Sequence, residues 1–430
     1  MEEDLKEIMT AGLSAADPKR AVARSLEVDG NRISADGESF EAERVFILSA
    51  GKAAGPMARA AEELLGGRVA GGLVVTKDEH DEGPEMLETF YASHPEPDAR
   101  GVEAAGKARE LAESLEKGDL LLALISGGAS ALLADPAPPI DIEDLKQLTS
   151  DLLKSGADIE EINTIRKHVS VLKGGGLARL VHPARTVALL LSDVVGDEPS
   201  SIASGLTTPD PTTLEDTAKT LDKYGIQPPE SVQDHLENAD ENPKPGDGIF
   251  DTVVNVVCGG GRHASEAAAE KARELGYEPL ILSTLITGDA AASGRLYAAI
   301  IREALESGNP VAPPCAIISG GEATVTVRGA GTGGPNLEFA LSLAVELDGV
   351  DGWTAFAIDT DGNDGSTDAA GGHVGGATAR EIRTGGISPD EALSNNDAYP
   401  ALKAADALIL TGPTGTNVND LRVALVGSFH

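Results

Sequence analysis

A lysine in a glycine-containing turn is the first residue of this sequence whose position suggests chemistry. Lys52 follows the apolar run Arg44–Ala50, typical of a buried strand, and precedes the alanine-rich run Ala53–Leu65, typical of a helix. In open α/β sheets, ligands bind beyond the carboxyl ends of the strands, where helix N-termini and free backbone N–H groups converge. An ammonium group there can neutralise a phosphate or a carboxylate. We therefore predict that Gly51 and Lys52 lie at a site for an anionic ligand, an ordinary exposed lysine being the alternative.

A second turn of the same kind contains glycines and serines. Ser126, Gly127, Gly128 and Ser130 follow the apolar run Asp119–Ile125. Successive backbone N–H groups in such a turn can form a concave nest that binds phosphate or carboxylate oxygens. A tight connection between a strand and a helix would use the same residues, and the spacing alone does not separate the two interpretations.

A basic cluster stands out in a chain that has few basic residues. Arg166, Lys167, His168 and Lys173 fall within eight positions, whereas the whole sequence holds only 34 lysines and arginines. Such a run is usually the solvated face of a helix. In so acidic a chain, however, a local concentration of positive charge suggests an anionic ligand, and we predict that Arg166 and Lys167 bind it.

An aspartate after another apolar run is the candidate for metal binding or proton transfer. Asp193 closely follows Val187–Leu191, a run typical of a buried strand. A carboxylate at a strand end contributes little to packing, but it suits Mg²⁺ ligation or general base catalysis. A solvated surface acid is an equally good explanation in this composition.

The second half of the chain has its own polar turns after apolar runs. The turn Ser319–Thr324 includes two glycines, a glycine-rich stretch opens a predicted helix over Asn336–Leu347, and an aspartate-rich stretch covers 358–366. That last stretch is not a calcium loop of the EF-hand type, since Ala370 stands where the twelfth-position glutamate belongs. The candidate binding residues of this half are Gly320, Gly321, Asn336, Glu338 and Asp361.

Several common sites are absent from the sequence. It has no Gly-x-x-x-x-Gly-Lys-Ser/Thr phosphate loop and no Gly-x-Ser-x-Gly nucleophile motif. The glycine-rich stretch Gly259–Ala264 resembles a dinucleotide fingerprint, but Ser283 and Thr284 occupy the place of the acid expected after the next strand. These absences disfavour P-loop chemistry, covalent hydrolysis and nicotinamide binding.

The elements that must position these residues alternate along the chain. Short apolar, β-branched runs alternate with alanine- and glutamate-rich runs, which predicts an α/β fold with a doubly wound, Rossmann-like parallel sheet. The polar stretch Glu237–Asp247 predicts a linker or exposed loop, and a second α/β series begins with a predicted strand at Thr252–Val257. Separate strands are expected at Ala316–Ser319 and Thr324–Val327. We predict an N-terminal domain over 1–240 and a C-terminal α/β domain with a mixed sheet over 241–430, with the active site in the cleft between them.

Charge and composition limit the partners. The 430 residues include 70 acidic and 34 basic side chains, for a net charge of −36, and the acid is spread along the chain. Repulsion disfavours nucleic acids and anionic membranes, and a high surface charge of this kind is typical of halophilic proteins. The first residues lack a signal peptide pattern, the apolar runs are too short to span a bilayer, and Cys258 and Cys315 have no metal-type spacing. We expect a cytoplasmic protein with both cysteines reduced.

The ordered set of motifs resembles the glycerate 2-kinases whose C-terminal part is the MOFRL domain, older members of which carry the name hydroxypyruvate reductase. The pieces that carry the resemblance are collinear over nearly the whole chain: Ala50–Ala54, Ser93–Pro97, Ile125–Ser130, Ile162–His168, Ser192–Asp197, Ser319–Glu322 and Thr360–Gly365. The resemblance implies two α/β domains, ATP and a divalent metal such as Mg²⁺, and a catalytic role for Lys52. One departure is Pro335, because many members have an arginine there that is thought to assist transfer.

On this resemblance we expect the chain to transfer the γ-phosphoryl group of ATP to the 2-hydroxyl of D-glycerate. Lys52 would contact the transferred phosphoryl group or the glycerate carboxylate, the Gly127–Gly128 turn would hold anionic oxygens, and Asp193 would ligate Mg²⁺ or orient the hydroxyl. Gly320, Gly321, Asn336 and Asp361 would line the opposite wall. The alternatives are an NAD(P)H-dependent hydroxypyruvate reductase and a binding protein without catalysis. The sequence leaves open whether the chain forms a homodimer.

Overall fold

The chain folds into two compact units. The computed structural model describes residues 1–77 and 83–427. The first unit is the continuous stretch Pro18–Cys258, and the second combines Met1–Asp17 with the chain from Gly259 onward. No helix of the described ranges has both the length and the apolar content needed to cross a membrane.

A six-stranded sheet forms the centre of the first unit. Its strand order is β6-β5-β4-β7-β8-β9, the order of a doubly wound Rossmann-like sheet, and the pairs from β6 to β8 are all parallel. Every residue of β7 is buried, as its unbroken apolar sequence predicts. The strands are β6 (Glu88–Ala92), β5 (Val69–Lys77), β4 (Arg44–Ala50), β7 (Asp119–Ser126), β8 (Arg185–Leu191) and β9 (Val253–Gly259).

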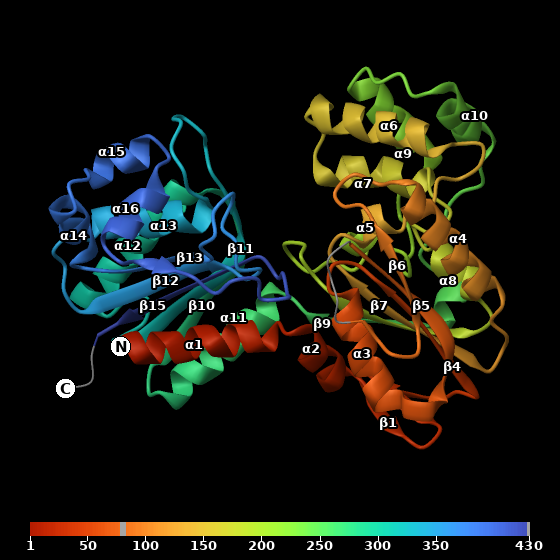
Figure 1. Cartoon of the computed structure of the whole chain (residues 1–430), viewed down its shortest axis with the longest axis horizontal. Helices are drawn as coiled ribbons and strands as arrows, with labels where there is room; N and C mark the ends of the chain where they lie inside the picture. Colours follow the sequence, from red (N-terminus) through yellow and green to blue (C-terminus); the bar gives the residue numbers. More distant parts are fainter. Residues whose placement is uncertain (78–82, 428–430) are drawn as a thin grey trace. The chain divides into compact units, whose positions relative to one another are not determined.

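Helices cover this sheet on both faces (Figure 1). On one side α3 (Ala54–Leu65) packs on β4 and β5, and α2 (Pro18–Ser25) packs on β8. On the other side four alanines of α4 (Ala99–Glu113), with Leu177 and Val181 of α8 (Gly176–Val181), enter one apolar core with β7 and β8. A small antiparallel sheet precedes β4 and consists of β1 (Glu27–Asp29), β2 (Arg32–Ala35) and β3 (Glu38–Glu41).

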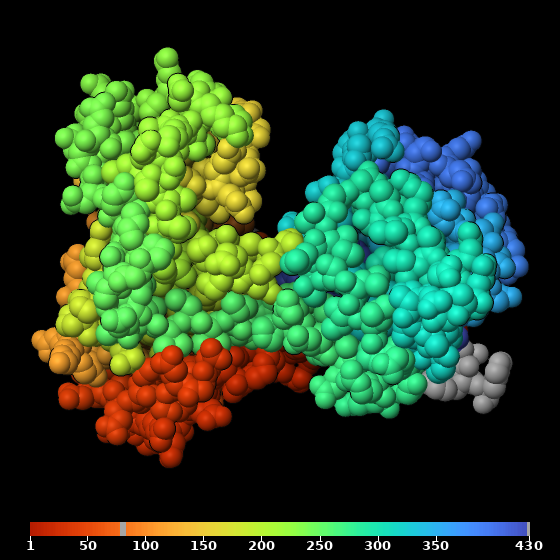
Figure 2. Space-filling view, turned by 180° about the vertical axis from the view of Figure 1, so that it is seen from behind, coloured from red at the N-terminus to blue at the C-terminus, as the bar shows by residue number. Residues whose placement is uncertain are grey.

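Four further helices form a helical subdomain of the first unit. It has its own apolar core, and all four helices contribute to it, for example through Leu148, Ile165, Leu221 and Val232. Its yellow and green atoms stand out from the sheet-bearing part of the unit in the space-filling view (Figure 2). The helices are α6 (Ile142–Ser155), α7 (Ile159–His168), α9 (Leu214–Lys223) and α10 (Glu230–Asn238).

The second unit contains a mixed six-stranded sheet of order β10-β11-β15-β12-β13-β14. Only β10 and β11 are parallel, and the other neighbours are antiparallel. Its strands are β10 (Glu278–Asp289), β11 (Cys315–Thr324), β15 (Asp420–Val426), β12 (Trp353–Asp359), β13 (Gly371–Gly375) and β14 (Leu408–Ile409).

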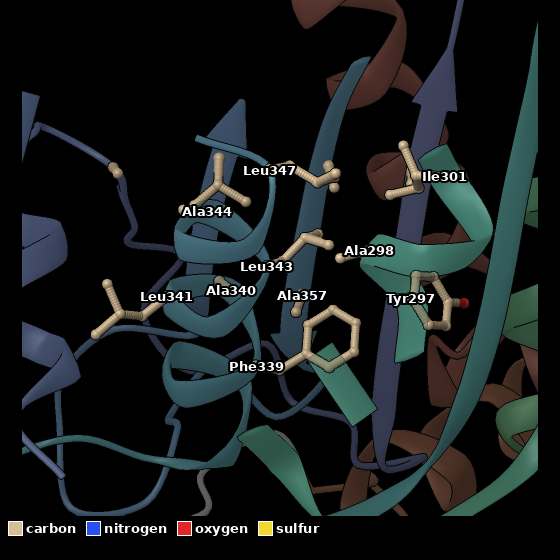
Figure 3. Close-up of a cluster of buried hydrophobic side chains, with 14 of the residues drawn as sticks. Tyr297, Ala298, Ile301, Phe339, Ala340, Leu341, Leu343, Ala344, Leu347 and Ala357 are labelled. Atoms are coloured by element: carbon tan, nitrogen blue, oxygen red, sulfur yellow. The ribbon is translucent and has the colours of Figure 1, made fainter. Parts of the chain in front are cut away.

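Each face of this mixed sheet has a separate core. On one face Tyr297 of α12 (Ala290–Ser307) meets Phe339 of α13 (Pro335–Glu346) edge to face, with ring centroids 5.2 Å apart (Figure 3). On the other face α1 (Glu2–Ala15) and α11 (Gly261–Glu274) bury Leu5, Ile8 and Ala268 against Phe356. The remaining short helices are α5 (Ala129–Leu132), α14 (Thr378–Thr384), α15 (Pro389–Ser394) and α16 (Ala398–Ala404).

The structure confirms the doubly wound and mixed sheets and corrects three details. The division between units falls at Cys258 and Gly259 rather than at 240, because β9 joins the first sheet instead of opening the second. The N-terminal segment belongs with the second unit because the apolar side of α1 is buried there. The strand expected at Ala316–Ser319 extends to Thr324 as β11, which is held by neighbours on both edges, whereas residues 325–327 of the second expected strand are not in a strand.

Candidate active site

The turns after β4 and β7 meet at the point where the strand order of the first sheet reverses. The backbone N–H of Lys52 donates to the carbonyl of Gly127 at 2.9 Å, and the N–H of Ala53 donates to Oγ of Ser126 at 3.0 Å. Gly51 has a φ of +126°, and a Cβ placed on it would lie 2.2 Å from Oγ of Ser126. This close approach requires glycine, and it holds Lys52 where ligands bind in folds of this type.

Asp193 reaches the same place from the loop after β8. A Cβ placed on Gly127 would lie 1.9 Å from Oδ2 of Asp193, so the carboxylate rests directly on the glycine. Burial raises the pKa of Asp193, and the ammonium group of Lys52 opposes that shift. Gly51, Lys52, Ser126, Gly127, Gly128 and Asp193, all predicted from the sequence, are therefore brought together by three adjacent parallel strands.

A pocket of about 230 Å³ adjoins this group within the first unit. Gly128 belongs to both, since a Cβ on Gly128 would lie 3.0 Å from Cδ2 of His94 and 3.3 Å from Cγ of Lys52. The pocket is lined by His94, Pro95, Pro97, Gly128, Ser130, Ala131, Ala134, Leu145, Thr149, Arg166, Ser170 and Lys173. The predicted residues Ser130 and Arg166 thus line a pocket next to Lys52.

His94 is a pocket residue that the motif analysis did not single out as functional. Burial lowers the pKa of its imidazole, and the positive charges of Lys52 and Lys77 lower it further. The ring is therefore neutral at neutral pH and can accept a proton or a hydrogen bond. Its segment, Ser93–Pro97, is one of the motifs that carry the family resemblance, but nothing in the sequence shows that this loop approaches Gly128.

The basic cluster divides between two environments. Lys167 is buried with its ammonium group 3.6 Å from Oδ1 of Asp210, away from the pocket, so its charge serves the packing of the helical subdomain. Arg166 and Lys173 instead line the pocket. Burial lowers the pKa of Arg166, and it lowers the pKa of Lys173 to about 8, with the Arg166 guanidinium adding to the shift and the Asp135 carboxylate opposing it.

Asp135 is a buried carboxylate that partly compensates the charge of Lys173 and that no motif of the sequence indicates. Its side chain is 2% exposed, and its Oδ1 lies 3.4 Å from Nε of Arg109. Burial raises the pKa of Asp135 to about 6, while Arg109 and Lys173 both pull it down. Its carboxylate connects a cation of α4 with a cation of the pocket, a relation that only the tertiary structure creates.

The glycines predicted from the second unit lie inside a strand. Gly320 and Gly321 belong to β11, and their sequence was expected to form a turn after it. Gly321 has a φ of +123°, and a Cβ on it would lie 2.1 Å from the carbonyl oxygen of Ile286 in β10. Close contact between two backbones accounts for glycine at this position.

Asn336 and Glu338 have internal partners at the start of α13. The Asn336 amide is fully buried and donates to Oδ1 of Asp420 at 2.6 Å and to Oδ1 of Asp364 at 3.2 Å. Oε2 of Glu338 accepts from the amide of Asn396 at 2.9 Å. Pro335 takes the first position of α13, where a missing N–H costs no helical hydrogen bond.

The aspartates around Asp361 form a partly buried acidic group. Asp361 itself is half-buried, and its Oδ1 accepts from the N–H of Asn363 at 2.8 Å, as in a tight turn. Burial raises the pKa of the neighbouring Asp359, and the negative charges of Asp361 and Asp420 raise it further. Burial also raises the pKa of Asp364 to about 7. These partners are explained by folding of the loop after β12, and a ligand role for Asp361 stays a prediction.

The donor set suits a metal only if the substrate supplies ligands as well. Within the described ranges, no three His, Cys, Asp or Glu side chains gather closely enough to hold an ion by themselves. Mg²⁺ is commonly bound through one or two carboxylates together with substrate phosphates and water. Asp193, a buried carboxylate beside Lys52, fits that mode.

Several known proteins of similar sequence and fold are named glycerate kinases. A domain of unknown function (DUF4147) matches residues 4–237, and the MOFRL family matches residues 315–420. A Thermotoga maritima protein named D-glycerate 2-kinase is 43% identical over 98% of this chain and 97% of its own length. The crystal structure of a glycerate kinase from the same organism matches with a TM-score of 0.90 at 42% identity, over 98% of each chain. This chain belongs to the glycerate kinase family.

Membership in the glycerate kinase family also bears on the oxidoreductase alternative. An Agrobacterium vitis relative, 43% identical over 98% of this chain and 94% of its own length, is named a hydroxypyruvate reductase, but only provisionally. In this chain the glycines that resemble a dinucleotide fingerprint join β9 to α11, and the next strand, β10, continues past Ser283 to Asp289. The relatives named glycerate kinase carry that name without such a qualification, so the comparisons favour the kinase over the reductase.

Proposed function

We propose that this protein is a glycerate 2-kinase, which transfers the γ-phosphoryl group of ATP to the 2-hydroxyl of D-glycerate and yields 2-phospho-D-glycerate and ADP. The observation that carries the proposal is the meeting of Lys52 and Asp193 over Gly127, next to a small pocket with basic walls. Full-length similarity to proteins named glycerate kinase supports the choice of acceptor.

In phosphoryl transfer the protein mainly has to align the acceptor hydroxyl with the phosphoryl group and neutralise the charge around that group. It needs to form no covalent bond itself. Lys52 neutralises the oxygens of the transferred group, and the Gly127–Gly128 turn lets those oxygens approach the backbone closely. Asp193 orients the 2-hydroxyl and takes up its proton, because its carboxylate rests on Gly127 beside Lys52. A bound Mg²⁺ would supply further neutralisation of the phosphates, held in part by Asp193.

The missing family arginine is compatible with this assignment. Pro335 cannot contribute a charge, whereas Arg166 lines the pocket beside the Lys52 turn and has no carboxylate partner within 4.0 Å in the described part of the chain. Arg166 therefore supplies positive charge on the acceptor side. The buried Lys167 does not take this role, because Asp210 neutralises it.

The activity is tested with purified protein, ATP, Mg²⁺ and D-glycerate, coupled to enolase in the absence of a phosphoglycerate mutase. Immediate formation of phosphoenolpyruvate shows that the 2-phosphate is made. ATP consumption without phosphoenolpyruvate would place the phosphate on the 3-hydroxyl and contradict the regiochemistry. A parallel assay with hydroxypyruvate and NADH, without ATP, should show no oxidation of the cofactor, and turnover there would favour the reductase.

The acidic surface leads to a second, independent part of the proposal. We propose that the protein is halophilic and cytoplasmic, which its net charge of −36 and its two free, buried cysteines support. Activity and melting temperature should rise between about 0.1 M and about 1 M KCl, since salt shortens the screening length from about 10 Å to about 3 Å. A melting temperature that falls over this range would contradict the halophilic part. A homodimer, also left open by the sequence, is tested by light scattering under the same conditions.

A further inference from the structure

We propose that Arg166 and Lys173 form the receptor for the carboxylate of the acceptor substrate, so that this pair makes the enzyme specific for small 2-hydroxycarboxylates over neutral alcohols. The inference rests on the proposed kinase function and adds to it the chemical group that the pocket selects.

The first argument is that neither Arg166 nor Lys173 forms an ion pair in the described part of the chain. Lys173 is 5% exposed and lies at the wall of the pocket, and Arg166 is half-buried beside it. In the described ranges neither side chain has a carboxylate within 4.0 Å, whereas the nearby Lys167 has Asp210. Two neighbouring cations that face a pocket without a partner are costly unless an anion enters it.

The second argument is that the position of Lys173 is unfavourable for its charged form. Burial and the charge of Arg166 together lower the pKa of Lys173, which means that its surroundings in the protein disfavour the ammonium form. Asp135, itself tied to Arg109 on α4, is the carboxylate that acts against this shift. His94 also faces the pocket but is neutral near pH 7, so it adds no counter-charge, and Asp135 is shared with Arg109.

The third argument separates a carboxylate from a nucleotide phosphate. The pocket has a volume of about 230 Å³, which suits a three-carbon acid and is below the roughly 300 to 1,000 Å³ typical of sites for larger ligands. The pocket adjoins the Lys52 turn at Gly128 and His94. A molecule bound by Arg166 and Lys173 at one end would therefore present its hydroxyl toward Lys52 and Asp193, which leaves Lys52 for the phosphoryl group.

The test compares Lys173→Met, Arg166→Lys and Arg166→Met with the surface control Lys154→Met in the last turn of α6. Methionine keeps the length of lysine and removes a charge that burial already disfavours, so Lys173→Met should fold. We expect KM for D-glycerate to rise about 10- to 100-fold in Lys173→Met and Arg166→Met, with KM for ATP unchanged and partial recovery in Arg166→Lys. Lys154→Met should behave as the wild type.

Two measurements keep the inference separate from the proposed function. Calorimetric titration with D-glycerate alone should show binding to the wild type that Lys173→Met weakens, and D-glyceramide, its neutral amide, should bind both proteins equally poorly. A rise in KM for ATP with unchanged glycerate binding would assign the pair to the nucleotide and overturn the inference while leaving the kinase intact. Lack of wild-type turnover would instead refute the kinase function, and the titration would still decide whether the pair binds a carboxylate.

Discussion

Gly127→Ala tests whether the distance between the β7 turn and Asp193 matters for catalysis. Gly127 does not have a left-handed φ, so alanine does not strain the backbone there. Its methyl group would, however, lie 1.9 Å from Oδ2 of Asp193 and 2.5 Å from its Cγ. The substitution therefore acts on the position of one carboxylate and leaves its identity unchanged.

The expected magnitude follows from this contact. Cβ atoms essentially never approach another heavy atom within 3.0 Å, so the Asp193 carboxylate must move by about 1 Å or more. A misplacement of about 1 Å can cost roughly 100-fold in rate, and we predict that kcat/KM falls by about that factor. The destabilisation should remain about 1 to 3 kcal/mol, as is usual for an added methyl group in a packed site.

The assay measures kcat/KM in the enolase-coupled reaction, together with the free energy of unfolding. Gly106→Ala is the matched control, since Gly106 lies in α4 and a Cβ there meets nothing within 4 Å. In an Asp193→Ala background, Gly127→Ala should add little further loss, because the group it displaces is gone. A folded Gly127→Ala protein with kcat/KM within about threefold of the wild type would refute the reasoning, because roughly a 1 Å shift should matter more.

Two further predictions concern buried charges. Lys167→Met should lower the free energy of unfolding by about 3 kcal/mol, because it leaves the Asp210 carboxylate buried without its lysine partner. The KM for D-glycerate should stay unchanged. A large rise in that KM would show that Lys167 contributes to the pocket. Asp359 has a pKa raised above its unfolded value, so its contribution to stability is present at low pH and is lost as pH rises through the folded pKa. When the pH is raised from about 5 to about 8, the melting temperature of Asp359→Asn should therefore fall less than that of the wild type. An equal fall in both proteins would contradict the raised pKa.

The parallel sheet could be predicted because its local signals are strong. Strands such as β7 are buried on both faces and appear in the sequence as unbroken apolar runs, so Arg44–Ala50 was predicted with the bounds that the structure has. The place of β9 could not be predicted, because an apolar run shows that a strand exists and not which sheet it joins. The same limit applies to α1, because its amphipathic pattern does not show which sheet its apolar side packs against.

The site was predictable where it depends on one rule and not where it depends on tertiary contacts. Residues after parallel strands meet at one edge of the sheet, so Lys52, Gly127 and Asp193 could be grouped before the structure was known. The different environments of Lys167 and Lys173 could not be predicted, because they depend on tertiary packing. Lys167 lies against Asp210, whereas Lys173, six residues further along, lines the pocket. A basic run in the sequence shows charge, and only packing shows which charge is free for a ligand.

Replacement of Lys52 by methionine is the most direct test of the central claim that the Lys52 turn carries phosphoryl transfer to glycerate. The measurement is kcat for ATP and D-glycerate, with the product identified through enolase, in wild type and Lys52→Met. We predict that the wild type forms 2-phosphoglycerate and that Lys52→Met loses about 100- to 1,000-fold in kcat, because a group that neutralises developing charge is removed. Its melting temperature and its calorimetric affinity for glycerate should be unchanged. A near-normal kcat in Lys52→Met, or a wild type that forms no 2-phosphoglycerate, would contradict the account.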